Sequence, residues 1–397
     1  MNNNHRWGEG VYNLISWFEK DRVQNAKVLV AGAGALGNEI LKNLALFGVG
    51  NIFIVDFDTI EYSNLTRSIL YREHDADKGL FKAEVAAARI REINPEINVH
   101  SIVGEVGCDV GLGLYRRLNV AIGGLDSIKA RMDLNRLCMR ANVPWVNGGI
   151  ENLKGQASVY RRGASCYECE LPLGTKQWLS QSVSCADVAR EAIAHQRVPT
   201  TPVIASIIGA IEVEEAMKII HEGTAHEKIF ESLTGEILRY DGNKQKCETI
   251  RSAAWHKNCT AHELWEPVVS INELSADSTV AEALDIIKNR LGCGNVEIQL
   301  RNDKFVDMLE VRQGMKAYLP MLPLRKISNY ITNNADLHGR QLGSINQHVY
   351  ENINEDFPYP QLTLREIGIP YLDILQVATE SDYVYVELSR DAKRYNL

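Results

Sequence analysis

The sequence lacks an uninterrupted apolar run of the roughly 18 residues that a membrane-spanning helix requires. The apolar stretch VIASIIGAIEVEEAMKII, residues 203–220, is interrupted by three glutamates. The first ten residues, MNNNHRWGEG, contain no apolar core of the kind that directs secretion. We therefore expect a cytoplasmic protein with no membrane segment.

The sequence also lacks a surplus of positive charge. Its 43 lysines and arginines are outnumbered by 51 aspartates and glutamates, which gives a formal net charge of −8. This balance argues against a general nucleic-acid-binding protein and is compatible with a basic protein partner. No internal repeat or low-complexity segment is evident. The 397 residues, 45% hydrophobic and 24% charged, are sufficient for two or three globular domains.

A disulfide framework is not expected either, because the eight cysteines occur in a long chain without a secretion signal. Cys166 and Cys169 form a C-x-x-C pair, which is half of a typical structural zinc site. Cys259 and His262 offer a second half at C-x-x-H spacing, and His256 is an alternative to His262. The pattern predicts a structural Zn²⁺ with four protein ligands. The competing interpretation is a reduced C-x-x-C pair that binds no metal.

Strands and helices alternate over the first 150 residues. Valine-rich apolar runs that end in glycine or aspartate predict buried strands, and apolar residues at helical spacing predict the helices between them. The predicted strands lie within residues 26–34, 51–58, 97–106, 118–126 and 143–150, and the helices within 35–48, 82–94 and 128–142. This order predicts an α/β fold with a doubly wound, mostly parallel, Rossmann-like sheet that binds ligands at the carboxyl ends of its strands.

The pattern changes after residue 150, where the alternation becomes irregular before a long helix predicted from about Pro202 to Glu222. Another pattern begins after Pro267, with a helix in TVAEALDIIKNRL followed by strand-like VEIQL, DILQVAT and YVYVEL. We therefore expect two domains. Residues 1–265 would form the nucleotide-binding domain, and residues 268–397 a smaller α/β domain that docks a partner.

A glycine-rich turn, GAGALG, links the first predicted strand to the first helix. Gly32, Gly34 and Gly37 would permit a tight turn and a close approach of phosphate to the positive end of the helix. Asp56, at the end of the second strand, is placed to accept hydrogen bonds from ribose hydroxyls. These features alone indicate an adenine nucleotide, for which NAD or FAD is the usual interpretation.

Further polar residues at the strand ends favour ATP. A second acid, Asp58, follows Asp56, and Asn64 and Arg67 come shortly afterwards. Lys82 begins the next helix, and Asp126 ends the fourth strand. Nicotinamide chemistry needs neither a metal nor a set of cations, whereas phosphoryl or nucleotidyl transfer uses both. We therefore predict a site for ATP with Mg²⁺.

The ordered motifs GAGALG, VDFDTIEYSNLTRS, FKAEVAA, GGLDS and CYEC resemble those of the ThiF/MoeB and ubiquitin-activating adenylyltransferases over about residues 20–265. The resemblance implies that Asp56 holds ribose, that Asn64, Arg67 and Lys82 contact the phosphates, and that Asp126 holds Mg²⁺. It also implies a homodimer that adenylates the C-terminal glycine of a ubiquitin-like protein. Hand-over of the activated protein to a conjugating enzyme would follow.

The sequence departs from the family pattern near the N-terminus. Glu9 occupies the position of an arginine that, in the family, reaches the ATP of the partner subunit. Arg6 is the first candidate to replace it and Arg22 the second. The family's usual Arg-Gln is Arg67-Ser68 here, and its Asp-Asn is Asp126-Ser127.

The segment that follows CYEC contains Cys185, in SVSCADVARE. In ubiquitin-activating relatives, a cysteine in this segment accepts the ubiquitin-like protein as a thioester. Cys185 is therefore the predicted nucleophile. The alternative is activation of a sulfur-carrier protein for thiamine or molybdopterin synthesis, although the C-terminal region lacks the cysteine-containing loop of a fused rhodanese domain.

Overall fold

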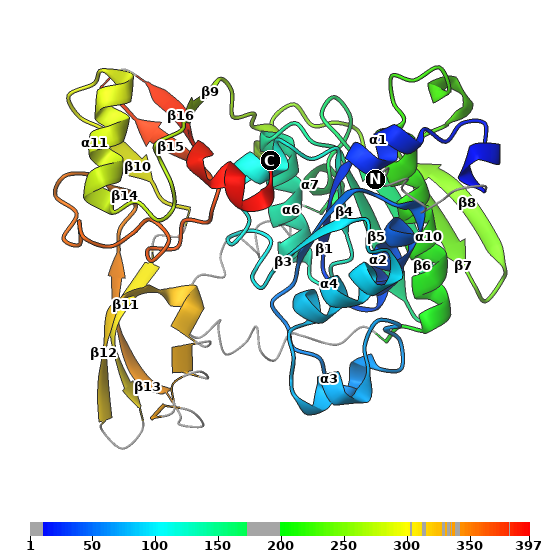
Figure 1. Ribbon diagram of the computed structural model, residues 1–397, viewed down its shortest axis with the longest axis horizontal. Coiled ribbons are helices and arrows are strands. Elements are labelled where there is room, and N and C mark those ends of the chain that lie inside the picture. The colour runs from blue at the N-terminus through cyan, green and yellow to red at the C-terminus, as the bar shows by residue number, and fades with distance from the viewer. Residues whose placement is uncertain are drawn as a thin grey trace, which may run out of the picture. The chain divides into compact units, whose positions relative to one another are not determined.

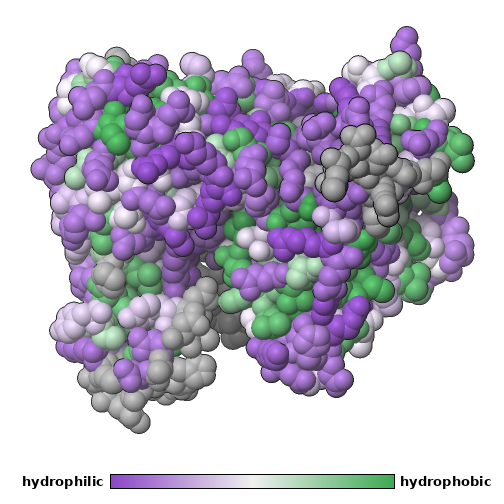
Figure 2. Space-filling view, in the orientation of Figure 1, coloured by the Kyte–Doolittle hydropathy of each residue, from purple (hydrophilic) through white to green (hydrophobic). Residues whose placement is uncertain are grey.

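The computed structural model describes residues 11–172, 199–301, 304–311, 315–327, 330–331, 334, 336–337, 342–380 and 382–397. Two compact units account for the chain, Met1–Gly107 with Tyr115–Leu264, and Cys108–Leu114 with Trp265–Leu397. Within the described ranges no helix is both long and apolar enough to cross a membrane. The face in Figure 2 is largely hydrophilic, with hydrophobic residues in small patches.

The first unit is built on an eight-stranded sheet with the order β3-β2-β1-β4-β5-β6-β7-β8. Its strands are β1 (Lys27–Ala31), β2 (Asn51–Val55), β3 (Asn98–Ile102), β4 (Val120–Gly123), β5 (Trp145–Glu151), β6 (Lys154–Tyr160), β7 (Glu236–Asp241) and β8 (Lys246–Arg251). Strands β1–β5 pair in parallel, whereas β6, β7 and β8 extend the sheet in antiparallel fashion. The predicted doubly wound, mostly parallel sheet is therefore confirmed, and its antiparallel extension is an addition to it.

Helices cover both faces of this sheet (Figure 1). The described helices of the first unit include α1 (Lys20–Asn25), α2 (Ala35–Phe47), α3 (Glu73–Asp77), α4 (Lys82–Ile93), α6 (Ile128–Arg140), α7 (Tyr167–Glu170) and α10 (Pro202–Ile220). The short helix α5 (Leu112–Tyr115) lies mostly in the second unit. Helix α2 packs against α4 and α10 on one face. On the other face, Leu134 of α6 lies close to Trp145 of β5 where Gly123 leaves space between them.

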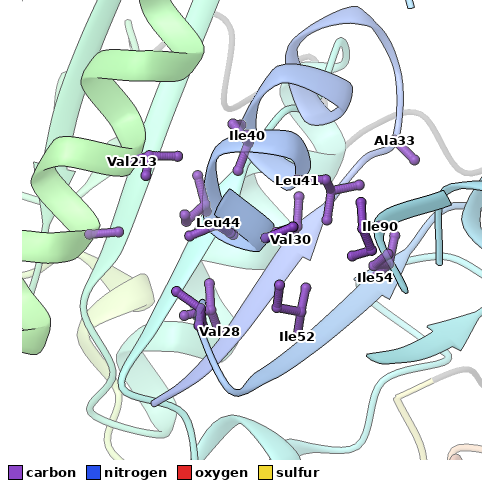
Figure 3. Packing of buried hydrophobic residues seen from close by; sticks show 14 of the residues in the cluster. Val28, Val30, Ala33, Ile40, Leu41, Leu44, Ile52, Ile54, Ile90 and Val213 are labelled. Carbon is purple, nitrogen blue, oxygen red and sulfur yellow. The ribbon is translucent and has the colours of Figure 1, made fainter. Parts of the chain in front are cut away.

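The core of the first unit lies between the parallel strands and helices α2, α4 and α10. Figure 3 shows Ile40, Leu41 and Leu44 of α2 beside Val28 and Val30 of β1. All five are fully buried, because the strands alternate apolar residues toward this layer and the helix presents them every three or four residues. Helix α2 ends at Phe47, and Gly48 caps it with a positive φ of 77°, a conformation that favours glycine.

The second unit has a five-stranded sheet of order β14-β10-β15-β16-β9 and a three-stranded antiparallel sheet of order β12-β11-β13. These strands are β9 (Val268–Ile271), β10 (Glu297–Gln299), β11 (Lys304–Val311), β12 (Met315–Pro323), β13 (Leu342–Val349), β14 (Asn352–Ile353), β15 (Ile374–Ala378) and β16 (Tyr383–Leu388). Helix α11 (Val280–Leu291) matches the predicted helix and begins with a Thr279–Glu282 capping box. The three-stranded sheet was not predicted.

The segment Cys108–Leu114 belongs to the second unit, although the sequence-based division placed it in the first domain. The amide of Leu112 donates to Oδ1 of Asp373 at 2.8 Å, and the amide of Gly113 donates to the carbonyl of Leu372 at 2.9 Å. A Cβ at Gly111 would lie 2.2 Å from the carbonyl oxygen of Tyr371. These contacts join residues about 260 positions apart, so the local sequence pattern gives no sign of them.

Candidate functional site

The glycine turn between β1 and α2 has one position that is open and two that are tightly enclosed. A Cβ at Gly37 would lie 2.0 Å from the carbonyl oxygen of Gly32, and one at Gly32 would lie 2.5 Å from that of Gly124. Gly32 also has a φ of +93°, which favours glycine. By contrast, no atom lies within 4 Å of the Cβ position of Gly34, at the N-terminal cap of α2. The open space lies where the first amides of the helix lack intrahelical partners, which is the position for a phosphate.

Two side chains that the sequence analysis did not identify hold this turn in place. Nδ2 of Asn38 donates to the carbonyls of Ala33 (2.7 Å) and Gly34 (2.9 Å), and its Oδ1 accepts from the amide of Leu70. The hydroxyl of Tyr71 donates to the same Ala33 carbonyl at 2.5 Å, and burial raises the pKa of Tyr71 well above its ordinary value. An asparagine in the first turn of α2 was a signal for such a role, because its side chain can bond to nearby backbone.

Asp56 follows β2 directly and bridges two segments of the site. Its Oδ2 accepts from the amide of Ala33 at 2.7 Å, and its Oδ1 accepts from the amide of Asp58 at 2.8 Å. Burial raises the pKa of Asp56, and the nearby positive charge of Lys82 opposes that rise. Each carboxylate oxygen can accept a second hydrogen bond. Asp56 can therefore fix the glycine turn and still accept a ribose hydroxyl.

Lys82 and Asp58 form an ion pair beside Asp56. The ammonium nitrogen of Lys82 lies 2.6 Å from Oδ2 of Asp58, and the amide of Lys82 donates to the carbonyl of Asp58 at 2.9 Å. Lys82 is buried at the start of α4, whereas about half of the Asp58 side chain is exposed. Asp58 therefore holds the charged Lys82 at the site, and a phosphate that binds Lys82 must share it with Asp58 or displace that carboxylate.

Asn64 is the last residue of a short 3-10 helix, Tyr62–Asn64, and Arg67 follows it. Both side chains make local contacts. Oδ1 of Asn64 accepts from the amide of Glu61 at 2.9 Å, so this buried side chain caps the helix. Nη1 of Arg67 donates to the carbonyl of Ser63 at 3.0 Å. Arg67 forms no ion pair with any residue that the structure describes. Its guanidinium charge therefore remains available to an anion.

Asp126 lies just beyond β4 and is exposed. It makes no hydrogen bond or ion pair within the described ranges of the chain. The next residue, Ser127, caps α6 by accepting from the amide of Ala130 at 3.1 Å. A serine at this position is therefore a suitable helix cap in place of the family's asparagine. Asp126 has the free carboxylate that a magnesium ligand requires.

The sheet register brings these residues to one edge. Ala31, the last residue of β1, pairs with Val55 of β2 and with Gly123 of β4. The glycine turn, Asp56 and Asp126 therefore all follow the carboxyl ends of adjacent strands, where the strand order reverses. Residues Arg6 and Cys185 lie outside the described residues.

Arg22 binds backbone carbonyls within the chain. Its Nη1 donates to the carbonyls of Ile220 (2.9 Å) and Glu222 (2.5 Å), at the C-terminal end of α10. A cation there satisfies carbonyls that lack helical partners. Arg22 is therefore a less suitable candidate than Arg6 for the arginine that reaches the partner subunit's ATP, because its guanidinium group is engaged at the end of this helix.

The metal-binding pattern is brought together as expected. The ligand atoms of Cys166, Cys169, Cys259 and His262 all lie within 4.8 Å of one another. The sulfur of Cys166 is 3.7 Å from that of Cys169 and 3.9 Å from that of Cys259, and the sulfur of Cys169 is 3.5 Å from Nε2 of His262. Tetrahedral Zn²⁺ with ordinary bond lengths would separate two sulfurs by about 3.8 Å and a sulfur from a nitrogen by about 3.5 Å. These residues therefore fit a structural zinc ion.

The environment of the four predicted ligands also favours a bound zinc ion. Burial raises the pKa of Cys166 to about 12, so a cation is needed for this sulfur to be a thiolate at neutral pH. Arg136 of α6 makes a two-pronged ion pair with Glu168 at 2.9 and 3.0 Å, between the first two cysteines. His256 is exposed and is not part of the cluster. The geometry therefore favours His262 over His256 as the fourth ligand.

A buried carboxyl group in α10 was not identified as a site residue. Glu212 is fully buried, and a Cβ on Gly148 of β5 would lie 2.4 Å from its carboxyl carbon. Burial raises the pKa of Glu212 well above its ordinary value, opposed by the charge of Arg131 and by the Gly148 amide. The glutamates in this otherwise apolar helix were a signal that one of them faces the core.

Comparison with known proteins decides the family. The ThiF family model matches residues 12–261, which is more than half of the chain. The chain belongs to the ThiF family. The predicted resemblance to this family is therefore confirmed.

Individual relatives cover different shares of this ThiF-family chain. It is 41% identical over 180 residues to the NEDD8-activating enzyme E1 catalytic subunit of Caenorhabditis elegans, covering 40% of this chain and 41% of that protein. It is 31% identical over 230 residues to the SAMP-activating enzyme E1 of Haloferax volcanii, covering 58% of this chain and 77% of that protein. A crystal structure of E. coli MccB with succinimide matches with a TM-score of 0.50 and 25% identity, covering 65% of this chain and 75% of that one. The chain thus spans less than half the length of the first of these curated relatives.

Proposed function

We propose that this ThiF-family chain binds ATP and transfers AMP to the C-terminal glycine of a ubiquitin-like protein. The observation that carries the proposal is the open space above Gly34 at the N-terminus of α2. A phosphate there would accept hydrogen bonds from backbone amides, and Lys82 and Arg67 would supply the positive charge. Further support comes from two relatives that are named as activating enzymes, for NEDD8 and for SAMP.

In the proposed reaction, a carboxylate oxygen of the terminal glycine bonds to the α-phosphorus of ATP. The bond from that phosphorus to the bridging oxygen breaks, and pyrophosphate leaves. Asp56 would hold the ribose, and Asp126 would hold Mg²⁺, which supplies positive charge to the departing phosphates. Asn64, Arg67 and Lys82 would contact the phosphates.

We also propose a second step on Cys185. Its thiolate would attack the acyl carbon of the adenylate, forming a thioester as AMP leaves, and the activated protein would pass to a conjugating enzyme. We further propose that the chain works as a homodimer and that Arg6 contributes to the partner subunit's site. The zinc ion held by Cys166 and its three fellow ligands would be structural, because four protein ligands leave no open position.

The test is ATP–pyrophosphate exchange with a purified ubiquitin-like protein that ends in glycine. Asp126→Ala should lower the exchange by about 100-fold or more, because the metal that neutralises the triphosphate loses its ligand. Asp285→Ala, which removes an exposed acid from α11 in the other compact unit, is the matched control and should retain exchange.

Full exchange by folded Asp126→Ala would contradict the site assignment. Formation of a thiocarboxylate with a sulfur donor, without any thioester on Cys185, would favour the sulfur-carrier alternative instead.

A further inference from the structure

A polar cavity of about 360 Å³ opens in the second compact unit, and none of the site residues assigned above lines it. Its lining includes three acids, two arginines, two serines and one tyrosine. The arginines are Arg390 and Arg394, from the 3-10 helix Ser389–Tyr395 that ends the chain. This volume is at the small end of the range for ligand pockets, so it suits a few side chains rather than a large cofactor.

The most buried acid of the cavity, Asp391, is already satisfied by its own chain. Its Oδ1 accepts from the hydroxyl of Ser275 at 2.6 Å. Its Oδ2 accepts from the amides of Ala276 at 3.0 Å and Leu372 at 2.9 Å. Three hydrogen bonds to one buried carboxylate fix its position and stabilise its charge. Asp391 therefore organises the floor of the cavity and has little capacity left for a ligand.

The other two acids also have partners within the chain. Asp277 accepts from the hydroxyl of Tyr371 at 3.0 Å. Glu282 accepts from the amide of Thr279 at 2.9 Å, as part of the capping box of α11. The acceptors of the cavity are therefore largely engaged in holding local structure.

The two arginines differ from the acids in this respect. Both are exposed, and neither guanidinium group forms a hydrogen bond or an ion pair with any part of the chain that the structure describes. The guanidinium carbon of Arg394 lies 4.2 Å from the ring centroid of Tyr371, which fixes it at the wall of the cavity. The hydrogen-bonding capacity that remains in the cavity is thus mainly that of cationic donors.

We propose that this cavity binds the carboxylate side chains of an acidic, extended peptide segment on a partner protein. Arg390 and Arg394 are four residues apart in a 3-10 helix, which rises about 2 Å per residue, so they are spaced by about 8 Å along its axis. Alternate side chains of an extended peptide are about 7 Å apart and point to the same side. Two acids at alternate positions could therefore each meet one arginine, in the planar two-pronged geometry that guanidinium and carboxylate groups favour.

A nucleic acid fits the cavity less well. Single-stranded nucleic acids are bound by open aromatic faces on which bases stack, whereas Arg394 covers the ring of Tyr371. The acids of the lining would also repel the continuous negative charge of a phosphate backbone, while an extended peptide can place isolated carboxylates at the arginines alone. These features favour an acidic peptide and go beyond the proposed adenylation.

The experiment measures fluorescence anisotropy of a labelled peptide of alternating glutamate and serine added to the full-length protein. We expect saturable binding that weakens with salt, and a loss of affinity of about 10-fold or more in Arg390→Ala and in Arg394→Ala. Lys393→Ala, which removes an exposed cation from the same helix outside the cavity, should change the affinity less than about twofold. All variants should be compared by thermal unfolding, and Arg390→Ala is the main test because its side chain makes no hydrogen bond within the described chain.

Equal binding of a peptide in which glutamine replaces glutamate would overturn the proposal. So would undiminished binding by Arg390→Ala, or an equal loss in Lys393→Ala. Displacement of the peptide by a short oligonucleotide or by inorganic phosphate at lower concentration would assign the cavity to phosphate ligands. Pyrophosphate exchange should be retained in Arg390→Ala, so failure of this proposal and failure of the proposed adenylation are distinguishable.

Discussion

Replacing Gly37 by alanine should destabilise the first unit. The added Cβ would lie 2.0 Å from the carbonyl oxygen of Gly32, a backbone atom that cannot rotate away. Relief requires a shift of α2, which is packed against the sheet and against the neighbouring helices α4 and α10. Overpacking of this kind costs about 3 kcal/mol, and the better helix propensity of alanine returns about 1 kcal/mol. We therefore expect the free energy of unfolding to fall by about 2 kcal/mol.

For a unit of this size, that loss corresponds to a decrease in Tm of about 4 to 8 °C. The assay is thermal unfolding followed by circular dichroism, with urea titration to obtain the free energy. Gly34→Ala is the matched control, since no atom lies within 4 Å of its Cβ position and its φ of −74° suits alanine. We expect the Tm of Gly34→Ala to stay within about 2 °C of wild type, because Gly34 makes no side-chain cap hydrogen bond that the substitution would remove.

The same control tests the site, because the methyl group at Gly34 would occupy the space proposed for a phosphate. We expect Gly34→Ala to weaken ATP binding by about 10-fold or more, measured by calorimetry on folded protein. Wild-type stability in Gly37→Ala, or an equal loss of stability in both variants, would refute the packing argument. Unchanged ATP affinity in Gly34→Ala would refute the placement of the phosphate.

Three further predictions concern other parts of the chain. Freshly purified protein should contain about one zinc per chain by elemental analysis, lost in Cys259→Ser and retained in His256→Ala, and no zinc in the wild type would contradict the metal site. Burial raises the pKa of Glu212 in the folded protein above the value in the unfolded chain. The contribution of Glu212 to stability is therefore fully present below the pKa of the unfolded chain, and it is lost as the pH rises toward the pKa of the folded protein. Urea titrations between pH 5 and 8 should therefore show wild type losing up to about 1.4 kcal/mol per pH unit relative to Glu212→Gln, and parallel curves would disprove this. Cys185→Ala should retain pyrophosphate exchange and lose the reductant-sensitive adduct on a gel, whereas an adduct that persists would place the nucleophile elsewhere.

The sequence by itself determined the parallel sheet and the edge at which its ligand site lies. Strand and helix periodicities follow from local geometry, and glycines at the strand–helix turn are required by backbone contacts within a few residues. Gly32 and Gly37 are such residues, since a Cβ on Gly37 would clash with the carbonyl oxygen of Gly32. The cysteine spacing likewise predicted the four residues whose ligand atoms the structure brings within 4.8 Å.

Only the tertiary structure decided which polar atoms are engaged within the chain. Asn64 and Arg22 are ordinary polar residues in sequence, yet Oδ1 of Asn64 caps a 3-10 helix and the guanidinium group of Arg22 binds carbonyls at the end of α10. The burial of Glu212 against Gly148 depends on how α10 crosses β5.

The membership of Cys108–Leu114 in the second unit also depends on the tertiary structure, through contacts with residues near Asp373. The physical reason is common to these cases. Hydrogen bonds and burial between segments far apart in the chain are set by packing, and local propensity carries no information about them.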